Sequence, residues 1–198
     1  MPKALILGCS HAAGSEMHNG VNKSYPVLLS QKMGLLPDNQ SIPGGSNDAM
    51  YRIFEHYVDV KKITSADVVI ACWTGSTRTE VQFDQQWQPL AQGIQHSNIV
   101  NYYKQWMVYD THHWKWRLNK IKNIIALNTI AKKIGIHVVN VFSFDMIEGY
   151  KPIDLYKEFY WPAGTTCFTD WCLEQGYEHT AGGHFSEVAH IEFSKLLL

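Results

Sequence analysis

Three short apolar runs, separated by long stretches with helical periodicity, constrain the fold of this chain more than any other feature. The runs cover residues 4–8, 67–73 and 136–142, and they are apolar at nearly every position. Runs of this kind are typical of parallel strands that are covered on both faces. Because the strands alternate with helices, the sequence predicts an α/β fold in which a doubly wound parallel sheet lies between two helical layers.

The stretches between these runs predict the other elements. Apolar residues at helical spacing predict four helices, at residues 24–33, 46–62, 114–134 and 186–197. Ser46 and Ser186 are expected to cap the second and the fourth helix. A brief second strand is expected at residues 39–42. Residues 74–101 are rich in glutamine and show no hydrophobic periodicity, which predicts a long excursion with at most short helices. Residues 143–168 are expected to be irregular.

Charge and composition exclude several classes of partner. The chain has 17 basic and 18 acidic residues and a formal net charge of -1, so it has no basic field that would bind nucleic acid or an anionic membrane. With 198 residues it is expected to form a single domain, residues 1–198, with a core that needs no disulfide. Four cysteines without a CxxC pair are expected to be reduced and buried: Cys9, Cys72, Cys167 and Cys172.

The sequence offers no marker of export or of a cofactor. Its first apolar run is too short for a signal peptide, and no stretch is long enough to span a bilayer, which predicts a cytoplasmic protein. No phosphate loop, GxGxxG fingerprint, GxSxG elbow or HExxH site is present, which excludes the main competing α/β enzymes, and no cofactor is expected. The ten histidines match no usual ligand spacing, so no metal site is expected.

A serine and a histidine at opposite ends of the chain form a candidate catalytic pair. Ser10 follows the first apolar run, at the edge where ligands bind in such sheets. His184 directly precedes the last expected helix, in a loop that should return to the same edge. A hydroxyl beside an imidazole is the general arrangement of a nucleophile and its base, so Ser10 Oγ and His184 are expected within hydrogen-bond reach.

Four ordered blocks resemble those of the SGNH (GDSL-like) hydrolase family. The blocks are GCSH after the first strand, NxSxxGGSND after the second, TGSTR after the third and GGHFSEVAH before the last helix. More narrowly, the first two are similar to a subgroup of small SGNH-like proteins found in the genomes of large tailed phages. The resemblance implies a flavodoxin-like sandwich with strand order 2-1-3-4-5. The activity that it implies is hydrolysis of an ester, often an acyl or acetyl group on a sugar or a lipid.

The family pattern carries over to some positions of this sequence and not to others. It implies that Ser10 is the nucleophile, that His184 is the base, and that the N–H groups of Ser10 and Gly44 bind the oxyanion. The asparagine of the third block is Thr77 here, which removes an amide donor. The aspartate expected three residues before the histidine is Ala181, so the triad is reduced to a dyad unless Glu178, Asp170 or a backbone carbonyl orients the imidazole.

Further polar residues at the same edge are candidates for substrate binding: Arg78, His11 and Asn47. Arg78 or Thr77 is expected to point into the Ser10 crevice and to replace the missing amide. Arg78 can instead form a surface ion pair with Glu80, and Asn47 is expected to cap its helix. The favoured function is a serine esterase or deacylase for a small-molecule or glycan ester. The alternative is a non-catalytic SGNH-like module that binds a glycan or a protein partner.

Overall fold

The structure is a computed structural model that describes residues 1–17, 20–83, 85–90, 113–144, 158–164 and 166–198. Its described strands are β1 (Lys3–Leu7), β2 (Leu36–Asn39), β3 (Val68–Trp73), β4 (Thr79–Phe83), β5 (Gln86–Leu90) and β6 (His137–Phe142). Its described helices are α1 (Ser10–Ala13), α2 (Tyr25–Lys32), α3 (Asn47–Asp59), α5 (His113–Lys133), α7 (Phe168–Glu174) and α8 (Glu187–Leu196), with a 3₁₀ turn at Gly20–Asn22.

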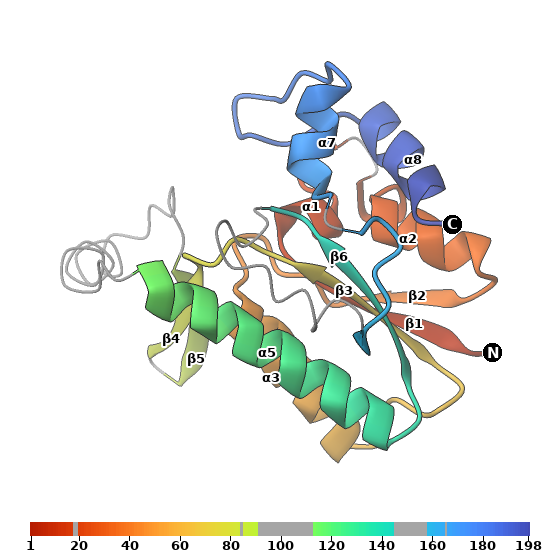
Figure 1. Cartoon of the computed structure of the whole chain (residues 1–198), viewed down its shortest axis with the longest axis vertical. Helices are drawn as coiled ribbons and strands as arrows, with labels where there is room; N and C mark the ends of the chain where they lie inside the picture. The colour runs from red at the N-terminus through yellow and green to blue at the C-terminus, as the bar shows by residue number, and fades with distance from the viewer. Residues whose placement is uncertain (18–19, 84, 91–112, 145–157, 165) are drawn as a thin grey trace.

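Four of the described strands form one parallel sheet with the order β2-β1-β3-β6 (Figure 1). In β1, Ala4 and Ile6 belong to one apolar core, and Leu5 and Leu7 belong to another on the opposite face. Both faces are therefore buried, because alternate side chains of a strand point to opposite sides. The expected parallel sheet, with β1 and β3 inside it, is confirmed.

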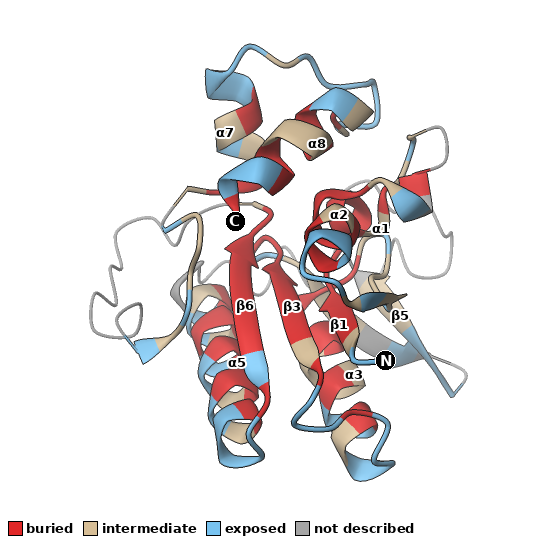
Figure 2. Ribbon diagram, turned by 90° about the vertical axis from the view of Figure 1, so that its right-hand side faces the viewer, coloured by how far each residue is buried: buried red, intermediate tan, exposed pale blue. Residues whose placement is uncertain are grey.

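Helices cover both faces of this sheet. Helices α3 and α5 pack on one face, and α2, α7 and α8 pack on the other, so the buried strands lie between two helical layers (Figure 2). Large aromatic side chains fill the second layer: Tyr25, Phe168 and Phe193 lie within 4.8–5.2 Å of one another as ring centroids. The expected three-layer sandwich is confirmed.

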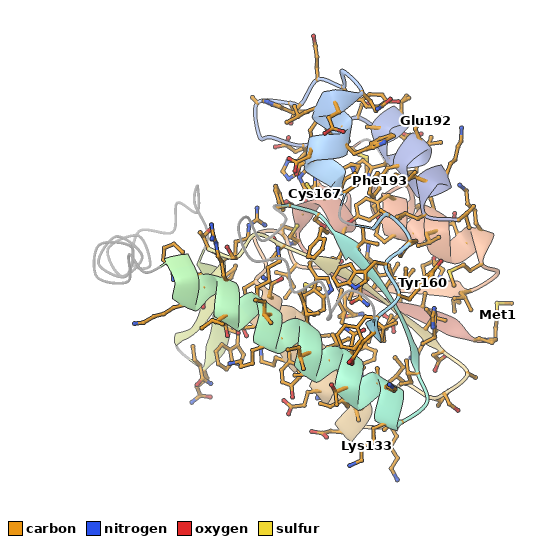
Figure 3. The ribbon with its side chains drawn as sticks, in the orientation of Figure 1. Met1, Lys133, Tyr160, Cys167, Glu192 and Phe193 are labelled. Atoms are coloured by element: carbon orange, nitrogen blue, oxygen red, sulfur yellow. The ribbon has the colours of Figure 1, made fainter. Side chains whose placement is uncertain are left out.

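The sheet differs from the expected strand order 2-1-3-4-5 at its outer edge, beside β6. The first four positions agree, but the described residues contain no fifth strand in this sheet. Instead, the Asn140 N–H donates to the carbonyl of Tyr160 at 3.0 Å, and Cys167 forms a single parallel bridge with Phe142. Figure 3 labels Tyr160 and Cys167 beside this strand. Within the described ranges, irregular chain rather than a complete strand therefore covers this edge.

Local signals placed most helices correctly. Ser46 Oγ accepts the Ala49 N–H at 3.1 Å, and Ser186 Oγ accepts the Ala189 N–H at 3.5 Å, so both expected caps are confirmed. Gly34 has a φ of 72°, which suits the end of α2. All four cysteines are free and buried, as expected.

Two expected elements are wrong. The second strand is Leu36–Asn39 rather than residues 39–42, because its register with β1 pairs Lys3 with Leu36 and Ile6 with Asn39. The excursion after β3 contains the antiparallel pair β4 and β5 instead of short helices. Arg52 of α3 holds this pair through Glu80 and through the Trp87 ring, which lies 5.1 Å from the guanidinium. The rest of that excursion, residues 91–101, lies outside the described residues.

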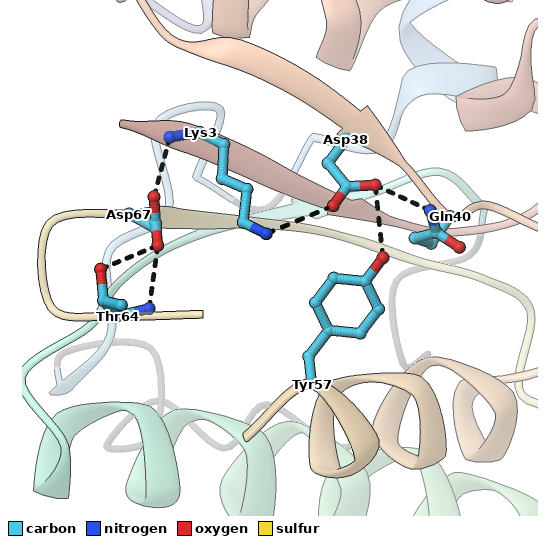
Figure 4. A network of polar contacts seen from close by, with 6 residues as sticks. All are labelled: Lys3, Asp38, Gln40, Tyr57, Thr64 and Asp67. Atoms are coloured by element: carbon cyan, nitrogen blue, oxygen red, sulfur yellow. Dashed lines mark hydrogen bonds and ion pairs between the residues drawn. The ribbon is translucent and has the colours of Figure 1, made fainter. Parts of the chain in front are cut away.

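A polar network fixes the amino-terminal edge of the sheet. Asp67, just before β3, accepts the Lys3 N–H, the Thr64 N–H and the Thr64 hydroxyl at 2.8–2.9 Å (Figure 4). The Lys3 ammonium extends to Asp38 of β2 at 3.6 Å, and the Tyr57 hydroxyl donates to the same carboxylate at 3.3 Å. These contacts connect β2, β1 and β3 to α3.

Candidate active site

Ser10 lies at the carboxyl edge of the sheet, as the first residue of α1. The helix begins after the extended Cys9, and the Ala13 N–H donates to the Cys9 carbonyl at 2.9 Å. Glycine is needed at position 8 because a Cβ there would lie 2.6 Å from the Cβ of Ala12. The turn after β1 therefore holds Ser10 in a fixed place, with 7% of its surface exposed.

The loop between β2 and α3 lies against the same turn. The Ile42 N–H donates to the Gly8 carbonyl at 3.0 Å. Gly44 has a φ of 74°, which glycine adopts without strain. A Cβ at Gly45 would lie 2.7 Å from the Ile42 carbonyl oxygen and 3.3 Å from that of Gly8. The loop thus packs closely beside the Ser10 turn, and oxyanion binding by the Gly44 N–H stays a prediction.

His184 reaches this edge on a tight hairpin between α7 and α8. The Thr180 N–H donates to the His184 carbonyl at 2.8 Å, and the Gly183 N–H donates to the Thr180 carbonyl at 2.9 Å. The His184 ring packs edge-on against His11, the residue after Ser10, with 5.2 Å between ring centroids. Two segments from opposite ends of the sequence therefore meet.

The predicted nucleophile, Ser10, and the predicted base, His184, are not in direct hydrogen-bond contact. The structure has no hydrogen bond between Ser10 Oγ and the His184 ring. Catalytic hydrogen bonds are often long or poorly aligned before a substrate binds. A direct bond between these two side chains therefore stays a prediction.

A carboxylate that the sequence reasoning missed lies beside His184. Glu16 Oε2 is 3.1 Å from His184 Nδ1, and the Thr180 hydroxyl donates to the same oxygen. The Nδ1 atom nevertheless has no partner with hydrogen-bond geometry, so the contact is close but poorly aligned, and it is an ion pair only when the imidazole is protonated. The Thr180 hydroxyl first, and His184 second, lower the pKa of Glu16.

None of the expected acids occupies this place. Ala181 lies in the turn of the hairpin, and in the described part of the chain neither Glu178 nor Asp170 has an ion pair with His184. One signal in the sequence could have made Glu16 a candidate, although it does not show the contact with His184. Glu16 is the only acidic residue before Asp38, and it follows Ser10 by six positions.

His11 is buried at the centre of the site, with 1% of its surface exposed and neither ring nitrogen hydrogen-bonded. Its ring centroid lies 4.6 Å from that of Phe144. Burial first, and then the charges of His184, His190 and Arg78, hold the pKa of His11 well below its ordinary value. His11 is therefore neutral at physiological pH, with one ring donor and one ring acceptor that are both buried and without a partner.

Arg78 lies at the same edge, in the loop after β3. Its guanidinium carbon is 4.5 Å from the centroid of the Phe144 ring, and its Nη1 atom is buried without a hydrogen-bond partner. The alternative ion pair with Glu80 is not formed, because both oxygens of Glu80 accept from Arg52, at 2.9 and 2.8 Å. Thr77 is exposed. Arg78 is therefore the better placed of the two candidates for the missing donor.

Asn47 does not cap its helix, which corrects one expectation. Ser46 is the N-cap, and the Asn47 side chain instead bonds to the backbone after β3. Its Oδ1 accepts the Thr74 N–H at 3.0 Å, and its Nδ2 donates to the carbonyls of Thr74 and Gly75 at 3.2 and 3.4 Å. The amide thus fixes the loop that carries Arg78, and direct contact with a substrate stays a prediction.

His190 has a structural role. Its Nδ1 accepts the Tyr25 N–H at 3.1 Å, and burial lowers its pKa to about 3. The imidazole therefore stays neutral and connects α8 to α2.

The part of the chain that the structure describes contains no group of three or more His, Cys, Asp or Glu side chains that could hold a metal ion. No helix in that part is long and apolar enough to cross a membrane.

Solved structures with a similar fold include several esterases and acylhydrolases. TesA aligns with a TM-score of 0.59 at 12% identity, over 98% of this chain and 95% of its own. The psychrotrophic esterase EstA from Pseudoalteromonas sp. aligns with a TM-score of 0.56 at 12% identity, over 100% of this chain and 94% of its own. This chain therefore shares the fold of TesA and of EstA. The lipase/acylhydrolase from Enterococcus faecalis aligns with a TM-score of 0.53 at 12% identity, over 100% and 93% of the two chains.

This likeness is one of tertiary structure. No protein-family model matches the sequence, and no curated protein matches it either. The α/β sandwich of these solved structures is therefore shared over almost the whole length of the chain, whereas fold alone assigns no role to the residues of the site.

Proposed function

We propose that this protein is a serine esterase or deacylase of the SGNH type that acts on an acyl ester. One observation carries the proposal. His184 packs against His11, beside the turn that presents Ser10, and has the Glu16 carboxylate at its Nδ1 atom. An imidazole between a serine turn and a carboxylate is the arrangement that activates a hydroxyl for acyl transfer.

The proposed reaction has two steps. Ser10 Oγ attacks the acyl carbon while its proton moves to His184, and the ester C–O bond then breaks as the leaving alkoxide takes that proton. Water next attacks the acyl-serine while its proton moves to His184, and the imidazolium then returns this proton to Ser10 Oγ as the bond from the acyl carbon to Ser10 Oγ breaks and the carboxylic acid leaves. The Ser10 and Gly44 N–H groups stabilise the oxyanion in both steps.

Arg78 and His11 narrow the proposed substrate class. A buried guanidinium nitrogen without a partner and a neutral imidazole with two unpaired nitrogens favour a polar ligand beside the ester. Arg78 binds a carbonyl or anionic group of that ligand. An O-acyl or O-acetyl group on a glycan or a lipid meets this description.

Labelling with a fluorophosphonate tests the proposal, because this reagent traps only an activated serine. One solved structure of EstA is inhibited by monoethylphosphonate. We expect the probe to modify Ser10, as identified by peptide mass spectrometry, and expect Ser10→Ala to abolish labelling. Ser65→Ala, an exposed serine at the opposite edge of the sheet, is the control. A folded protein that stays unlabelled would favour the non-catalytic binding module.

A further inference from the structure

We propose that Glu16 is the positioning residue for His184 and takes the place of the aspartate that the SGNH resemblance implies at position 181. The inference rests on the proposed hydrolase function. It differs from the family pattern because the acid comes from the loop after the nucleophile, rather than from the segment that carries the histidine.

Three contacts hold the Glu16 carboxylate against the His184 hairpin. Its Oε2 atom lies 3.1 Å from His184 Nδ1 and accepts the Thr180 hydroxyl. Thr180 is itself part of the hairpin, because its hydroxyl also accepts the His184 N–H at 3.2 Å. Gly182 completes the contact, since a Cβ there would overlap the carboxylate. The absence of a side chain at position 182 thus leaves the space that the carboxylate occupies.

The loop that carries Glu16 is tightly folded. The Ser15 N–H donates to the Ser10 carbonyl at 3.0 Å, which connects the loop to the nucleophile turn. Gly14 and Gly20 approach so closely that neither position has space for a Cβ. Glu16 itself has a φ of 63°, a left-handed conformation that is uncommon for a residue other than glycine. Such a backbone persists only where the surrounding structure holds it, and here it directs the side chain to the hairpin.

A carboxylate at Nδ1 keeps the proton of a neutral imidazole on that atom and leaves Nε2 free to accept a proton. It also stabilises the imidazolium that forms when the base takes the proton of the serine. His11 and His190 also interact with His184, and burial lowers the pKa of both rings, so both are neutral. Glu16 is therefore the anionic partner of His184 in the described part of the chain.

Titration of the Glu16 carboxyl group tests the contact without any activity measurement. Carbon-13 NMR of the side-chain carboxyl should show a pKa below the ordinary value for glutamate, as the Thr180 hydroxyl and His184 require. The pKa should rise in Thr180→Val and in His184→Gln. If Glu16 titrates at its ordinary value in all three proteins, the carboxylate does not contact His184 in solution and the inference is overturned.

Kinetics test the positioning role. Glu16→Gln should lower kcat for an ester, or the rate of Ser10 phosphonylation, by between about tenfold and 10⁴-fold, with KM changed by less than about threefold. Glu16→Asp, which keeps the charge, should recover part of this loss. Glu174→Gln removes an exposed carboxylate from α7 and should change neither parameter.

The outcomes separate this inference from the proposed function. Unchanged labelling of Ser10 in Glu16→Gln would refute the role of Glu16 while the hydrolase stands. Loss of labelling in Glu178→Gln, with normal labelling in Glu16→Gln, would assign the role to the other acid. If the parent protein is not labelled at all, the proposed function fails, and the carboxyl titration still decides whether Glu16 contacts His184.

Discussion

Replacing Gly182 with alanine should reduce catalysis without reducing stability. The turn from Thr180 to Gly183 is closed by the hydrogen bond between their backbone groups, at 2.9 Å. Gly182 is not among the residues with positive φ, so alanine fits its backbone conformation. The three heavy atoms nearest to the new methyl group would all belong to the carboxylate of Glu16, the end of a flexible side chain of which 43% is exposed. We therefore expect the carboxylate to move away from His184.

The magnitudes of the two effects differ. Glycine to alanine at a compatible position changes the free energy of unfolding by about 0.4–1 kcal/mol in favour of the folded state, because the unfolded chain loses freedom. Turnover should instead fall by at least about tenfold, as for loss of the acid itself. Denaturant unfolding and ester hydrolysis measure these quantities on the same preparation.

Two further variants make this prediction decisive. In a Glu16→Ala background, Gly182→Ala should cause no additional loss of turnover, because no carboxylate remains to be displaced. Gly176 has a φ of 76° and open space around it, so Gly176→Ala should cost about 1–2 kcal/mol of stability and leave turnover unchanged. Full activity in Gly182→Ala, or an equal loss of activity when Glu16 is absent, would refute the reasoning.

Two other predictions concern the donor at the oxyanion and the edge of the sheet. Arg78→Ala should lower turnover by at least about tenfold, a conservative fraction of the roughly 2.7–4 kcal/mol that one oxyanion donor supplies, and Thr77→Val tests the competing donor. Full activity of both variants, with Ser10→Ala inactive, would show that another group stabilises the oxyanion. Burial opposes ionisation of Asp67, but the hydrogen bonds from Lys3 and Thr64 outweigh it and lower the pKa of Asp67. Because the pKa of Asp67 is lower in the folded state than its value of about 3.9 in the unfolded chain, its carboxylate stabilises the fold fully above pH 3.9. This stabilisation is lost as the pH falls through the pKa of the folded state. Asp67→Asn should therefore lower the free energy of unfolding by about 1.5–3 kcal/mol near neutral pH and by progressively less in acid. A cost that does not change with pH, measured by urea unfolding, would contradict this account.

Much of the fold could be predicted from local pattern. The run from Val68 to Trp73 and the run from His137 to Phe142 are apolar because both faces of these strands are covered. Ser46 and Ser186 act within three residues of their own positions, so a sequence pattern can identify them as caps. The turn that carries Ser10 was predictable for the same reason, since Gly8 lies directly before it.

Contacts between distant segments decided the rest. Strand β2 is an edge strand with little apolar signal, and only its register with β1 sets its bounds. The glutamine-rich pair β4 and β5 is held by Arg52 from another element, which no local pattern indicates.

The candidate site divides in the same way. The sequence alone made Ser10, Gly44 and His184 candidates, because each lies in a block that resembles the family pattern. It could not identify the acid, since Glu16 and His184 are far apart in the chain and their 3.1 Å contact exists only when the hairpin folds onto the loop after α1. Residue type and spacing determine which groups are available for chemistry, whereas the close packing of two loops at the sheet edge decides which of them meet.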